Sequence, residues 1–295
     1  MKTFEFETYD VFTDQRFTGN QLAVVMNADG LSTEDMQMIT REFNLAESAF
    51  ILPPENVENT ARVRIFTPAY EMPFAGHPTV GTAIAIARAR NLSGLLKLEL
   101  NAGLFPVTVN LSGGAAFAEF QNPNLPSETG AAPPADRLEA ALSLPAGSIE
   151  IGDHKPRLVG AGVDFVYANA PLDAVRQARV NSAAFEALGI TEPVGVLLYA
   201  KGVDAPDIDF HVRMFAPEAG VVEDAATGSA AAALPGQIVL CEDLTDGEHI
   251  WKIKQGVEMG RPSLINARVQ IKNGAVISVH IGGCAVLVQK GQLSY

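Results

Sequence analysis

The chain has 295 residues, enough for two domains of ordinary size, and a content of 47% hydrophobic and 19% charged residues is typical of a folded globular protein. Its 34 acidic and 21 basic residues give a net charge of −13, which disfavours binding to a polyanion. The composition therefore argues against a disordered protein and against a nucleic-acid-binding protein.

The first half of the sequence predicts strands curled around one long helix. Residues 4–12 and 22–26 predict an opening hairpin, and Ser32 with Asp35 resembles a capping box before a helix over Thr33–Phe43. An Ala-rich helix follows Pro78, a residue suited to a first helical turn. Further strands are predicted at Ser48–Leu52, Ala61–Phe66, Leu96–Leu100, Leu104–Asn110 and Ala115–Phe120.

A polar, Pro-rich stretch with little apolar periodicity separates the two halves, and we interpret residues 121–134 as a linker. The first domain then covers residues 1–120, with a C-terminal strand near 284–295 as a candidate to complete it, and the second covers 135–283. Beyond the linker the sequence predicts a helix over Leu172–Leu188, strands at 157–159, 164–168, 194–199 and 209–215, and a final meander at 264–271, 275–281 and 285–289 with a turn at Asn273-Gly274.

The two halves share an internal repeat. Arg64-Ile65-Phe66-Thr67-Pro68 leads into Ala75-Gly76-His77-Pro78, and Arg213-Met214-Phe215-Ala216-Pro217 leads into Ala226-Thr227-Gly228-Ser229. Each copy predicts a strand, a loop, a turn of small residues and an Ala-rich helix. We interpret the repeat as a duplicated domain, the alternative being chance similarity of two Gly/Ala-rich helix starts.

Each repeat ends in a helix start that is suited to binding an anion. A helix N-terminus presents unpaired backbone N–H groups and the positive end of the helix dipole, so it favours a carboxylate or phosphate. Two such turns could hold one small anionic substrate. The alternative is that both are simply well-formed helix ends, with Thr227 or Ser229 as caps.

Three titratable residues stand beside these turns or near them. Asp224 directly precedes the second turn, where it could cap the helix or exchange protons with a ligand. His77 lies inside the first turn, where the positive helix end would keep its imidazole neutral. Glu47 lies between a predicted helix and an apolar strand, where burial would suit a general base, although a partly exposed strand-end carboxylate is the alternative.

The sequence gives no indication of a membrane, secreted or metal-binding protein. No apolar stretch approaches the roughly 18 residues of a membrane span, and the first residues lack the apolar core of a signal peptide, so we expect a cytoplasmic protein. Two cysteines, Cys241 and Cys284, are too few for a disulfide framework or a thiolate zinc site. The spacing of the histidines pairs no two metal ligands, and we expect no metal and no cofactor.

A set of segments in chain order carries a family signature: Asp10-Val11-Phe12-Thr13, Phe17-Thr18-Gly19-Asn20, Glu47-Ser48-Ala49-Phe50, Gly76-His77-Pro78-Thr79-Val80-Gly81-Thr82-Ala83, Glu223-Asp224-Ala225-Ala226-Thr227-Gly228-Ser229-Ala230 and Gln255-Gly256-Val257-Glu258-Met259-Gly260-Arg261-Pro262-Ser263. Over nearly its whole length the chain thus resembles the PhzF-like family of phenazine biosynthesis, which shares the fold of diaminopimelate epimerase. The resemblance implies an α+β fold of two pseudo-symmetric domains, each a curved, mostly antiparallel sheet around a central helix, with the active site in the cleft between them.

The resemblance also implies which residues act. The catalytic residues are Glu47 as the proton-transferring base, with His77 and Asp224 holding polar groups of the substrate, and the substrate-binding residues are Ser48, Gly76, Gly228 and Ser229. The partner implied is a small carboxylate-bearing metabolite, and a homodimer is a possible assembly. Gln21 and Ala225 stand where the family often has proline, but neither change removes a proton-transfer group.

Epimerases of this fold carry a cysteine in each helix-start turn, whereas Ala75 and Ala226 stand there in this chain. A two-thiol racemase is therefore disfavoured. The leading hypothesis is a cofactor-independent isomerase that shifts a proton, as in a double-bond shift. The alternatives are an epimerase that uses Glu47 and Asp224 as opposed acid and base, and a small-molecule binding protein without turnover.

Overall fold

The computed structural model describes residues 2–150, 152–190, 195–202 and 205–295 of the chain. The chain divides into unit 1, which is Met1–Gln121 with Gly282–Tyr295, and unit 2, which is Asn122–Ile281. Among the described residues, no helix is both long and apolar enough to cross a lipid bilayer.

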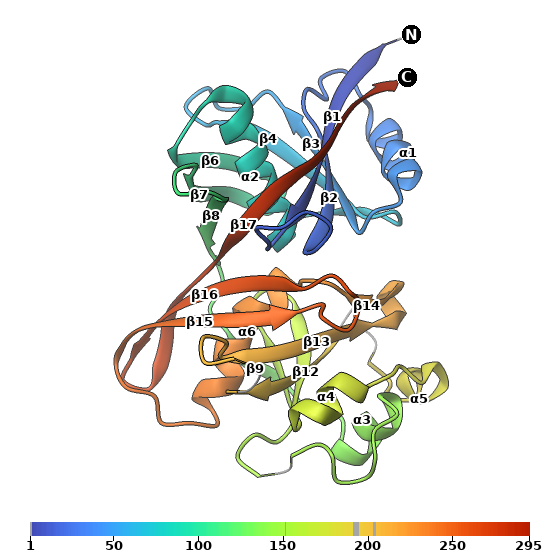
Figure 1. The fold of residues 1–295 in the computed structure, drawn as a ribbon, viewed down its shortest axis with the longest axis vertical. Helices are drawn as coiled ribbons and strands as arrows, with labels where there is room; N and C mark the ends of the chain where they lie inside the picture. The colour runs from blue at the N-terminus through green and yellow to red at the C-terminus, as the bar shows by residue number, and fades with distance from the viewer. Residues whose placement is uncertain (1, 151, 191–194, 203–204) are drawn as a thin grey trace. The chain divides into compact units, whose positions relative to one another are not determined.

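Unit 1 is built from strands that surround one helix (Figure 1). Its helices are α1 (Thr33–Phe43) and α2 (Gly76–Arg90), and its strands are β1 (Thr3–Val11), β2 (Asn20–Val25), β3 (Glu47–Leu52), β4 (Ala61–Phe66), β5 (Glu71–Met72), β6 (Gly94–Leu100), β7 (Gly103–Asn110), β8 (Ala116–Gln121) and the later part of β17 (Ala275–Ser294).

The strands of unit 1 pair in a closed series that begins and ends at β17. β1 pairs antiparallel with β17 and with β2, β2 runs parallel to β3, and β3 is antiparallel to β4. β4 runs parallel to β6, and β6, β7 and β8 follow as antiparallel neighbours. β8 in turn pairs with β17. The opening hairpin and the strands predicted for this half are therefore confirmed, with shifts of a residue or two at their ends.

Helix α2 fills the interior of unit 1. Every residue from Gly76 to Ala87 is buried, and the helix contacts β1, β2, β3, β7 and β8. Apart from His77, Thr79 and Thr82, the buried stretch consists of apolar residues and glycine on all sides, which is the pattern of a helix enclosed by the rest of the fold. At Gly81 an added Cβ would lie 2.6 Å from the Leu22 side chain and 2.7 Å from that of Val11. A glycine is therefore needed where the helix crosses β1 and β2.

Helix α1 lies on the other side of β3. The predicted capping box is confirmed, because the Ser32 hydroxyl accepts from the Asp35 backbone while the Asp35 carboxylate accepts from the Ser32 backbone. Met36 and Ile39 pack with Phe50 and Phe66 in a second apolar cluster. The two faces of β3 are therefore buried under different helices.

Unit 2 also places a helix against a mixed sheet. Its helices are α3 (Ala135–Ala141), α4 (Leu172–Gln177), α5 (Ser182–Glu186), the 3₁₀ turn η1 (Pro217–Ala219) and α6 (Gly228–Val239), and its strands are β9 (Ser127–Gly130), β10 (Arg157–Gly160), β11 (Asp164–Asn169), β12 (Gly195–Lys201), β13 (Phe210–Ala216), β14 (Val221–Asp224), β15 (Gly247–Gln255), β16 (Ser263–Lys272) and the first part of β17.

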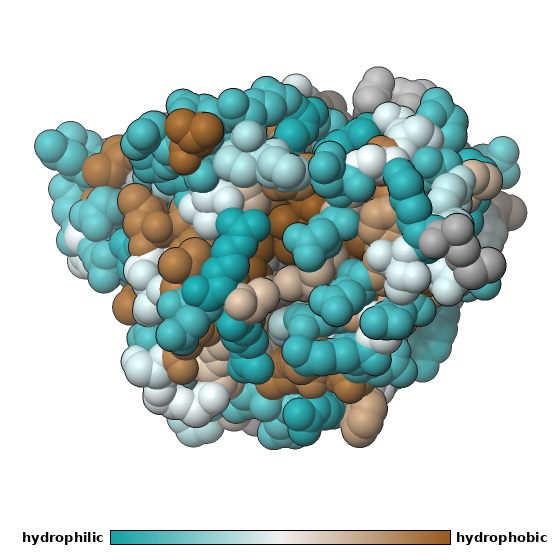
Figure 2. Space-filling model, turned by 90° about the horizontal axis from the view of Figure 1, so that it is seen from above, coloured by the Kyte–Doolittle hydropathy of each residue, from teal (hydrophilic) through white to brown (hydrophobic). Residues whose placement is uncertain are grey.

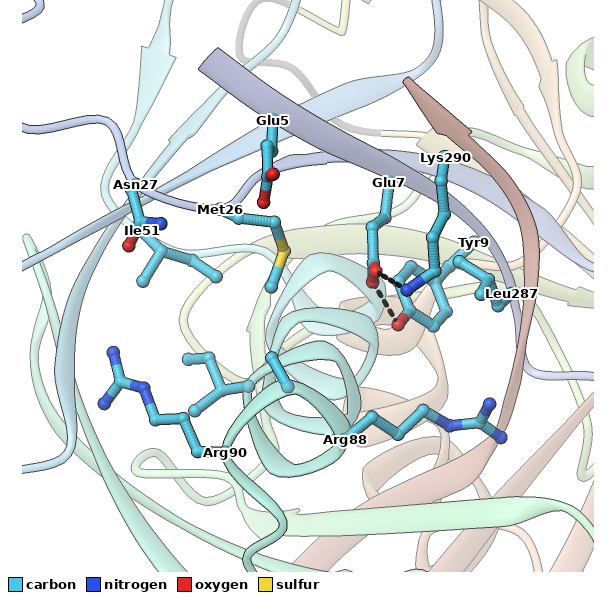
Figure 3. Close-up of a pocket in the computed structure, with 12 residues that line it drawn as sticks. Glu5, Glu7, Tyr9, Met26, Asn27, Ile51, Arg88, Arg90, Leu287 and Lys290 are labelled. Carbon is cyan, nitrogen blue, oxygen red and sulfur yellow. Dashed lines mark hydrogen bonds and ion pairs between the residues drawn. The ribbon is translucent and has the colours of Figure 1, made fainter. Parts of the chain in front are cut away.

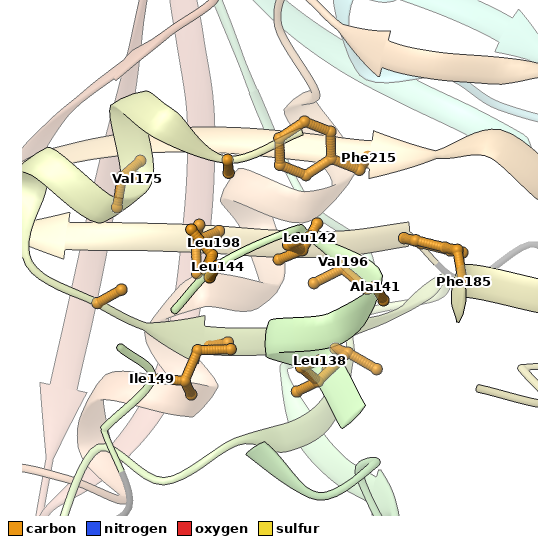
Figure 4. Packing of buried hydrophobic residues seen from close by; sticks show 14 of the residues in the cluster. Leu138, Ala141, Leu142, Leu144, Ile149, Val175, Phe185, Val196, Leu198 and Phe215 are labelled. Carbon is orange, nitrogen blue, oxygen red and sulfur yellow. The ribbon is translucent and has the colours of Figure 1, made fainter. Parts of the chain in front are cut away.

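Both faces of the unit 2 sheet are covered. Helix α6 contacts β9, β10, β11 and β16, while an apolar cluster fills the space between the sheet and helices α3 to α5 (Figure 4). Leu142, Val196, Leu198 and Phe215 belong to this cluster. At the surface, Figure 2 shows hydrophilic side chains over one face of the molecule, with apolar ones in separate areas among them.

Several predictions for the second half need correction. The helix predicted over Leu172–Leu188 is two short helices, because Ala178 is extended (ψ 137°) and Asn181 starts α5 as its N-cap. The segment interpreted as a linker contains β9, which pairs with β10. The strands predicted at 275–281 and 285–289 form one continuous strand, β17. Val194, the first residue of the strand predicted at 194–199, lies outside the described residues.

The Arg-x-Phe part of the repeat has the same structural role in both units. Arg64 on β4 donates two hydrogen bonds, of 2.7 and 2.6 Å, to Glu71 on β5, and its guanidinium lies 5.1 Å from the centre of the Phe66 ring. Arg213 on β13 bonds Glu223 on β14 at 2.8 and 2.7 Å and lies 4.9 Å from the Phe215 ring. Each arginine thus fixes the short strand that precedes a helix start.

Candidate active site

The predicted base and the predicted histidine lie together in unit 1. Glu47 is the first residue of β3 and His77 is the second residue of α2, and His77 Nε2 lies 3.2 Å from Glu47 Oε2. The Glu47 side chain is 17% exposed, whereas that of His77 is 5% exposed. The carboxylate is therefore accessible to a small molecule from one side while a nearly enclosed imidazole supports it from the other.

His77 is neutral in the folded protein. Burial lowers its pKa to about 3, because the enclosed site disfavours the charged ring, and a backbone hydrogen bond with Gln21 offsets only part of this effect. The predicted neutrality is confirmed, but desolvation is its largest cause rather than the helix dipole. A neutral imidazole has one donor and one acceptor nitrogen, so His77 can donate a hydrogen bond without carrying charge.

Asn20 also contacts His77, and the sequence interpretation gave it no role. Its side chain is buried, and its Nδ2 lies 3.4 Å from His77 Nδ1. Together with Gln21 it fixes the ring between β2 and Glu47. Asn20 belongs to the Gly-Asn segment of the family signature, which was the available signal, but no local pattern connects it with a histidine 57 residues away.

Ser48 is fully buried and follows Glu47 on β3. Successive side chains of a strand point to opposite faces, so Ser48 shares a face with Phe50, which packs under α1, and not with Glu47. Within the described part of the chain its hydroxyl has no hydrogen-bond partner. The Ser48 side chain and the Glu47 carboxylate therefore occupy opposite sides of the strand.

The two helix starts of the repeat share an unusual property. Neither α2, preceded by Ala75, nor α6, preceded by Thr227, has a side-chain cap, and neither has an acidic residue in its first turn. Helix α1 has both. The first N–H groups of α2 and α6, at Gly76 and Gly228, thus keep the anion-binding character that a cap would neutralise.

Asp224 lies at the end of β14 in unit 2, three residues before the N-cap of α6. Its carboxylate accepts a 2.6 Å hydrogen bond from the Thr227 hydroxyl. Gln255 joins the two residues: its Nε2 donates to the Asp224 carbonyl at 2.8 Å and to the Thr227 hydroxyl oxygen at 3.0 Å, and its Oε1 accepts from the Thr227 backbone at 3.1 Å. Gln255 is 1% exposed. It is a buried clamp that the sequence interpretation missed, because its partners lie about thirty residues away.

The structure therefore collects the predicted site residues into two groups. Glu47, Ser48, Gly76 and His77 lie in unit 1, and Asp224, Gly228 and Ser229 lie at the start of α6 in unit 2, with Ser229 partly exposed. The two thiols lie in neither group. Cys241 lies just after the end of α6, where it contacts Arg157, and Cys284 lies on β17. Burial raises the pKa of both thiols.

The chain is similar to known isomerases over its whole length. A family model described as phenazine biosynthesis-like protein, PhzC-PhzF, matches residues 9–291. An uncharacterized isomerase of Mesorhizobium japonicum is 42% identical, with 99% of each chain covered. A trans-2,3-dihydro-3-hydroxyanthranilate isomerase of Pseudomonas aeruginosa is 36% identical, with 96% of each covered.

A solved structure gives the same result for the fold. The crystal structure of a PhzF family phenazine biosynthesis protein of Bacillus anthracis superposes with a TM-score of 0.91 at 26% identity, and the match covers 100% of both chains. These similarities confirm the family resemblance and the isomerase class that were predicted from the sequence motifs. The chain belongs to the phenazine biosynthesis-like PhzC-PhzF family and is an isomerase.

Proposed function

We propose that this isomerase works without a cofactor and moves a proton on a small carboxylate-bearing metabolite, with Glu47 as the proton-transferring base. The observation that carries the proposal is the 3.2 Å approach of Glu47 Oε2 to His77 Nε2. A buried imidazole at this distance can hold the carboxylate in place, and the base then acts when the bound substrate brings its proton within about 2.6–3.2 Å of the carboxylate. Because the Glu47 side chain is only 17% exposed, few water molecules compete with a substrate for its carboxylate.

His77 then acts as a neutral partner of the base. Because its pKa is about 3, it does not compete for the proton near neutral pH, and it can donate a hydrogen bond to Glu47 or to a polar group of the substrate. Asn20 and the Gln21 backbone set the ring orientation. A protonated His77 would instead hold Glu47 as an ion pair and make it a weaker base.

We further propose that residues of both units bind one substrate molecule, in the cleft expected from the family resemblance. The uncapped starts of α2 and α6 would supply N–H donors for its carboxylate, from Gly76, Gly228 and Ser229. Asp224, oriented by Thr227, would accept from a hydroxyl or ammonium of the substrate. Ser48 would contribute through its backbone, since its hydroxyl faces away from Glu47.

A specific compound allows the proposal to be tested. Three relatives that are 35–36% identical are named trans-2,3-dihydro-3-hydroxyanthranilate isomerases, and this compound carries the carboxylate that the site requires. The purified chain is incubated with it in D₂O, and the product is followed by proton NMR. The proposal predicts a shifted double bond with one deuterium incorporated from solvent.

Other results distinguish the alternatives. Inversion of a stereocentre with deuterium incorporation would favour an epimerase that uses Glu47 and Asp224. If neither this compound nor a panel of small carboxylic acids that bind the protein exchanges a proton, the proton-transfer function is wrong. The binding-protein alternative would then account for the site.

A further inference from the structure

The loop that joins β1 to β2, residues 12–19, lies at the same edge of the sheet as the Glu47–His77 pair. Asn20 is the first residue of β2 and directly follows the loop. β2 runs parallel to β3 with Leu22 beside Glu47, so both strands begin at this edge. The buried Asn20 side chain, whose Nδ2 lies 3.4 Å from His77 Nδ1, is the point at which the loop meets the pair.

The backbone of this loop is strained just before Asn20. Phe17 has a φ of +69°, which is unusual for a bulky residue, and it is 71% exposed, so burial of its ring does not compensate for the strain. Gly19 also has a φ of +69°, and an added Cβ would lie 2.5 Å from the Val11 carbonyl oxygen. A non-glycine residue keeps such a conformation only where surrounding contacts hold it. The loop therefore needs a contact that fixes the backbone at Phe17.

Asp10, near the end of β1, supplies that contact. Asp10 is 3% exposed, and its Oδ2 accepts a 2.6 Å hydrogen bond from the Phe17 backbone N–H, seven residues along the chain. A hydrogen bond to a carboxylate is charge-assisted and is stronger than one between neutral groups. The Thr13 and Thr18 hydroxyl oxygens, 2.5 Å apart, close the same loop a second time. The conformation in which the chain enters β2 therefore depends on Asp10.

Asp10 lies on the face of β1 that points away from α2. Side chains alternate along a strand, so Asp10 and Tyr9 point to opposite faces. Figure 3 shows Tyr9 and Glu7 beside the last turns of α2, where Glu7 accepts a 2.6 Å hydrogen bond from the Tyr9 hydroxyl and pairs with Lys290 at 2.6 Å. The Glu7 carboxylate thus joins β1 to β17, whereas the Asp10 carboxylate holds the loop that leads to His77.

We propose that Asp10 is a positioning residue of this isomerase, which fixes the loop so that Asn20 holds the His77 imidazole beside Glu47. The proposal rests on the roles proposed above for Glu47 and His77. A base has to lie within about 2.6–3.2 Å of the proton that it takes, and a misplacement of about 1 Å can cost roughly 100-fold in rate. Loss of Asp10 should therefore slow proton transfer more than it weakens substrate binding.

Steady-state kinetics of Asp10→Ala test this proposal with a compound that the wild type turns over. We expect kcat to fall roughly tenfold or more, and KM to change by less than about threefold. Asp10→Asn keeps an oxygen that can accept from the Phe17 N–H, so its kcat should stay within about threefold of the wild type. If Asp10→Ala does not fold, Asp10→Ser replaces it with the same expected result, because a serine hydroxyl keeps the position polar but does not reach the Phe17 N–H.

Glu139→Ala is the matched control. Glu139 on α3 is also a buried carboxylate, 5% exposed, and it accepts a 2.9 Å hydrogen bond from the Ile149 backbone N–H, but it belongs to unit 2. Both Asp10→Ala and Glu139→Ala should lower the melting temperature, whereas only Asp10→Ala should lower kcat. An equal loss of kcat in the two variants would show that Asp10 only stabilises the fold, and would overturn the proposal.

NMR of ¹⁵N-labelled histidine rings gives a readout that does not need turnover. The His77 ring signals, assigned by their absence in His77→Gln, should move in the same direction in Asp10→Ala and Asn20→Ala and stay in place in Glu139→Ala. The losses of kcat should also be non-additive, because residues that act through one contact are coupled. In a chain that carries Asn20→Ala, the change Asp10→Ala should cost less than about a further twofold. Unmoved His77 signals, or fully additive losses, would overturn the proposal.

Glu47→Gln separates a failure of this proposal from a failure of the proposed function. If Glu47→Gln retains wild-type proton exchange, the proposed function itself is wrong. If Glu47→Gln loses exchange while a folded Asp10→Ala keeps the wild-type kcat, only the positioning role of Asp10 is wrong.

Discussion

Replacing Gln255 with alanine should destabilise unit 2 and disorganise the start of α6. The change removes the hydrogen bonds to the Asp224 carbonyl, the Thr227 hydroxyl and the Thr227 backbone N–H at a position that is 1% exposed. Each typical hydrogen bond contributes about 1 kcal/mol net, and a buried group left without a partner costs about 1–3 kcal/mol. We therefore expect a loss of about 3–4 kcal/mol in the free energy of unfolding.

Differential scanning calorimetry measures this loss as a shift of the melting temperature. For a unit of this size, about 3 kcal/mol corresponds to a decrease of roughly 6–12 °C. Gln255→Met keeps the length of the side chain without its hydrogen bonds, so it should show most of the effect and separate hydrogen bonding from packing. Gln270→Ala on the partly exposed side of β16 is the matched control and should change stability by less than about 0.5 kcal/mol.

The clamp also predicts an effect on Asp224. Without Gln255, the Thr227 hydroxyl loses one of the groups that orient it toward the Asp224 carboxylate. In the proposed mechanism this should raise KM more than it lowers kcat, because Asp224 binds the substrate and Glu47 transfers the proton. If Gln255→Ala and Gln255→Met both melt within 1 °C of the wild type, roughly 0.5 kcal/mol, the clamp contributes nothing and this reasoning is refuted.

The remaining predictions concern His77, the backbone near Asp224 and the thiols. The pKa of His77 is about 3 in the folded chain, against an ordinary value of 6.5. As the pH falls from 6.5 toward 3, the unfolded chain therefore takes up a proton that the folded chain does not. The stability that is present above pH 6.5 is lost over this range. Urea unfolding should show a loss of about 2 kcal/mol between pH 7 and 5 in the wild type that is missing in His77→Gln; equal losses would contradict it. Gly256→Ala should cost about 1–3 kcal/mol, because φ is +76° and the new Cβ would lie 2.6 Å from the Ala225 carbonyl oxygen; a melting temperature equal to that of the wild type would disprove this. Changing Cys241 and Cys284 to serine should leave turnover intact, since burial raises the pKa of both thiols; stoichiometric inactivation by alkylating one of them, with protection by substrate, would show the reverse.

Local patterns predicted those parts of the fold whose causes are local. The capping box at Ser32 and Asp35 placed α1 at the residues where the structure has it. The helix predicted over 172–188 failed because apolar periodicity continues through its break, although Asn181 is an N-cap residue that could have indicated a second start. The length of β17 could not be predicted either, since Gly282 and Gly283 suggest an interruption that pairing with other strands overrides.

In the candidate site, too, local motifs predicted some residues and missed those whose contacts join distant segments. Motifs identified Glu47, His77 and Asp224, and the structure brings Glu47 and His77 into contact. Asn20 and Gln255 were quoted in those motifs but given no role, because their hydrogen bonds join segments far apart in the sequence. The repeat indicated two equivalent helix starts, but it did not explain the role of Arg64 and Arg213. Their partners, Glu71 and Glu223, can be recognised only from the pairing of the strands.

The measurement that tests the central claim most directly is solvent exchange by Glu47→Gln. The amide keeps the shape of the side chain but cannot accept a proton near neutral pH. For a compound that the wild type turns over, deuterium incorporation from D₂O should fall at least ~100-fold, the lower end of a general-base contribution, while ligand binding and melting temperature are retained. Glu42→Gln, an exposed change on α1, should incorporate deuterium at the wild-type rate. Wild-type exchange by a folded Glu47→Gln protein would contradict the assignment of Glu47 as the base.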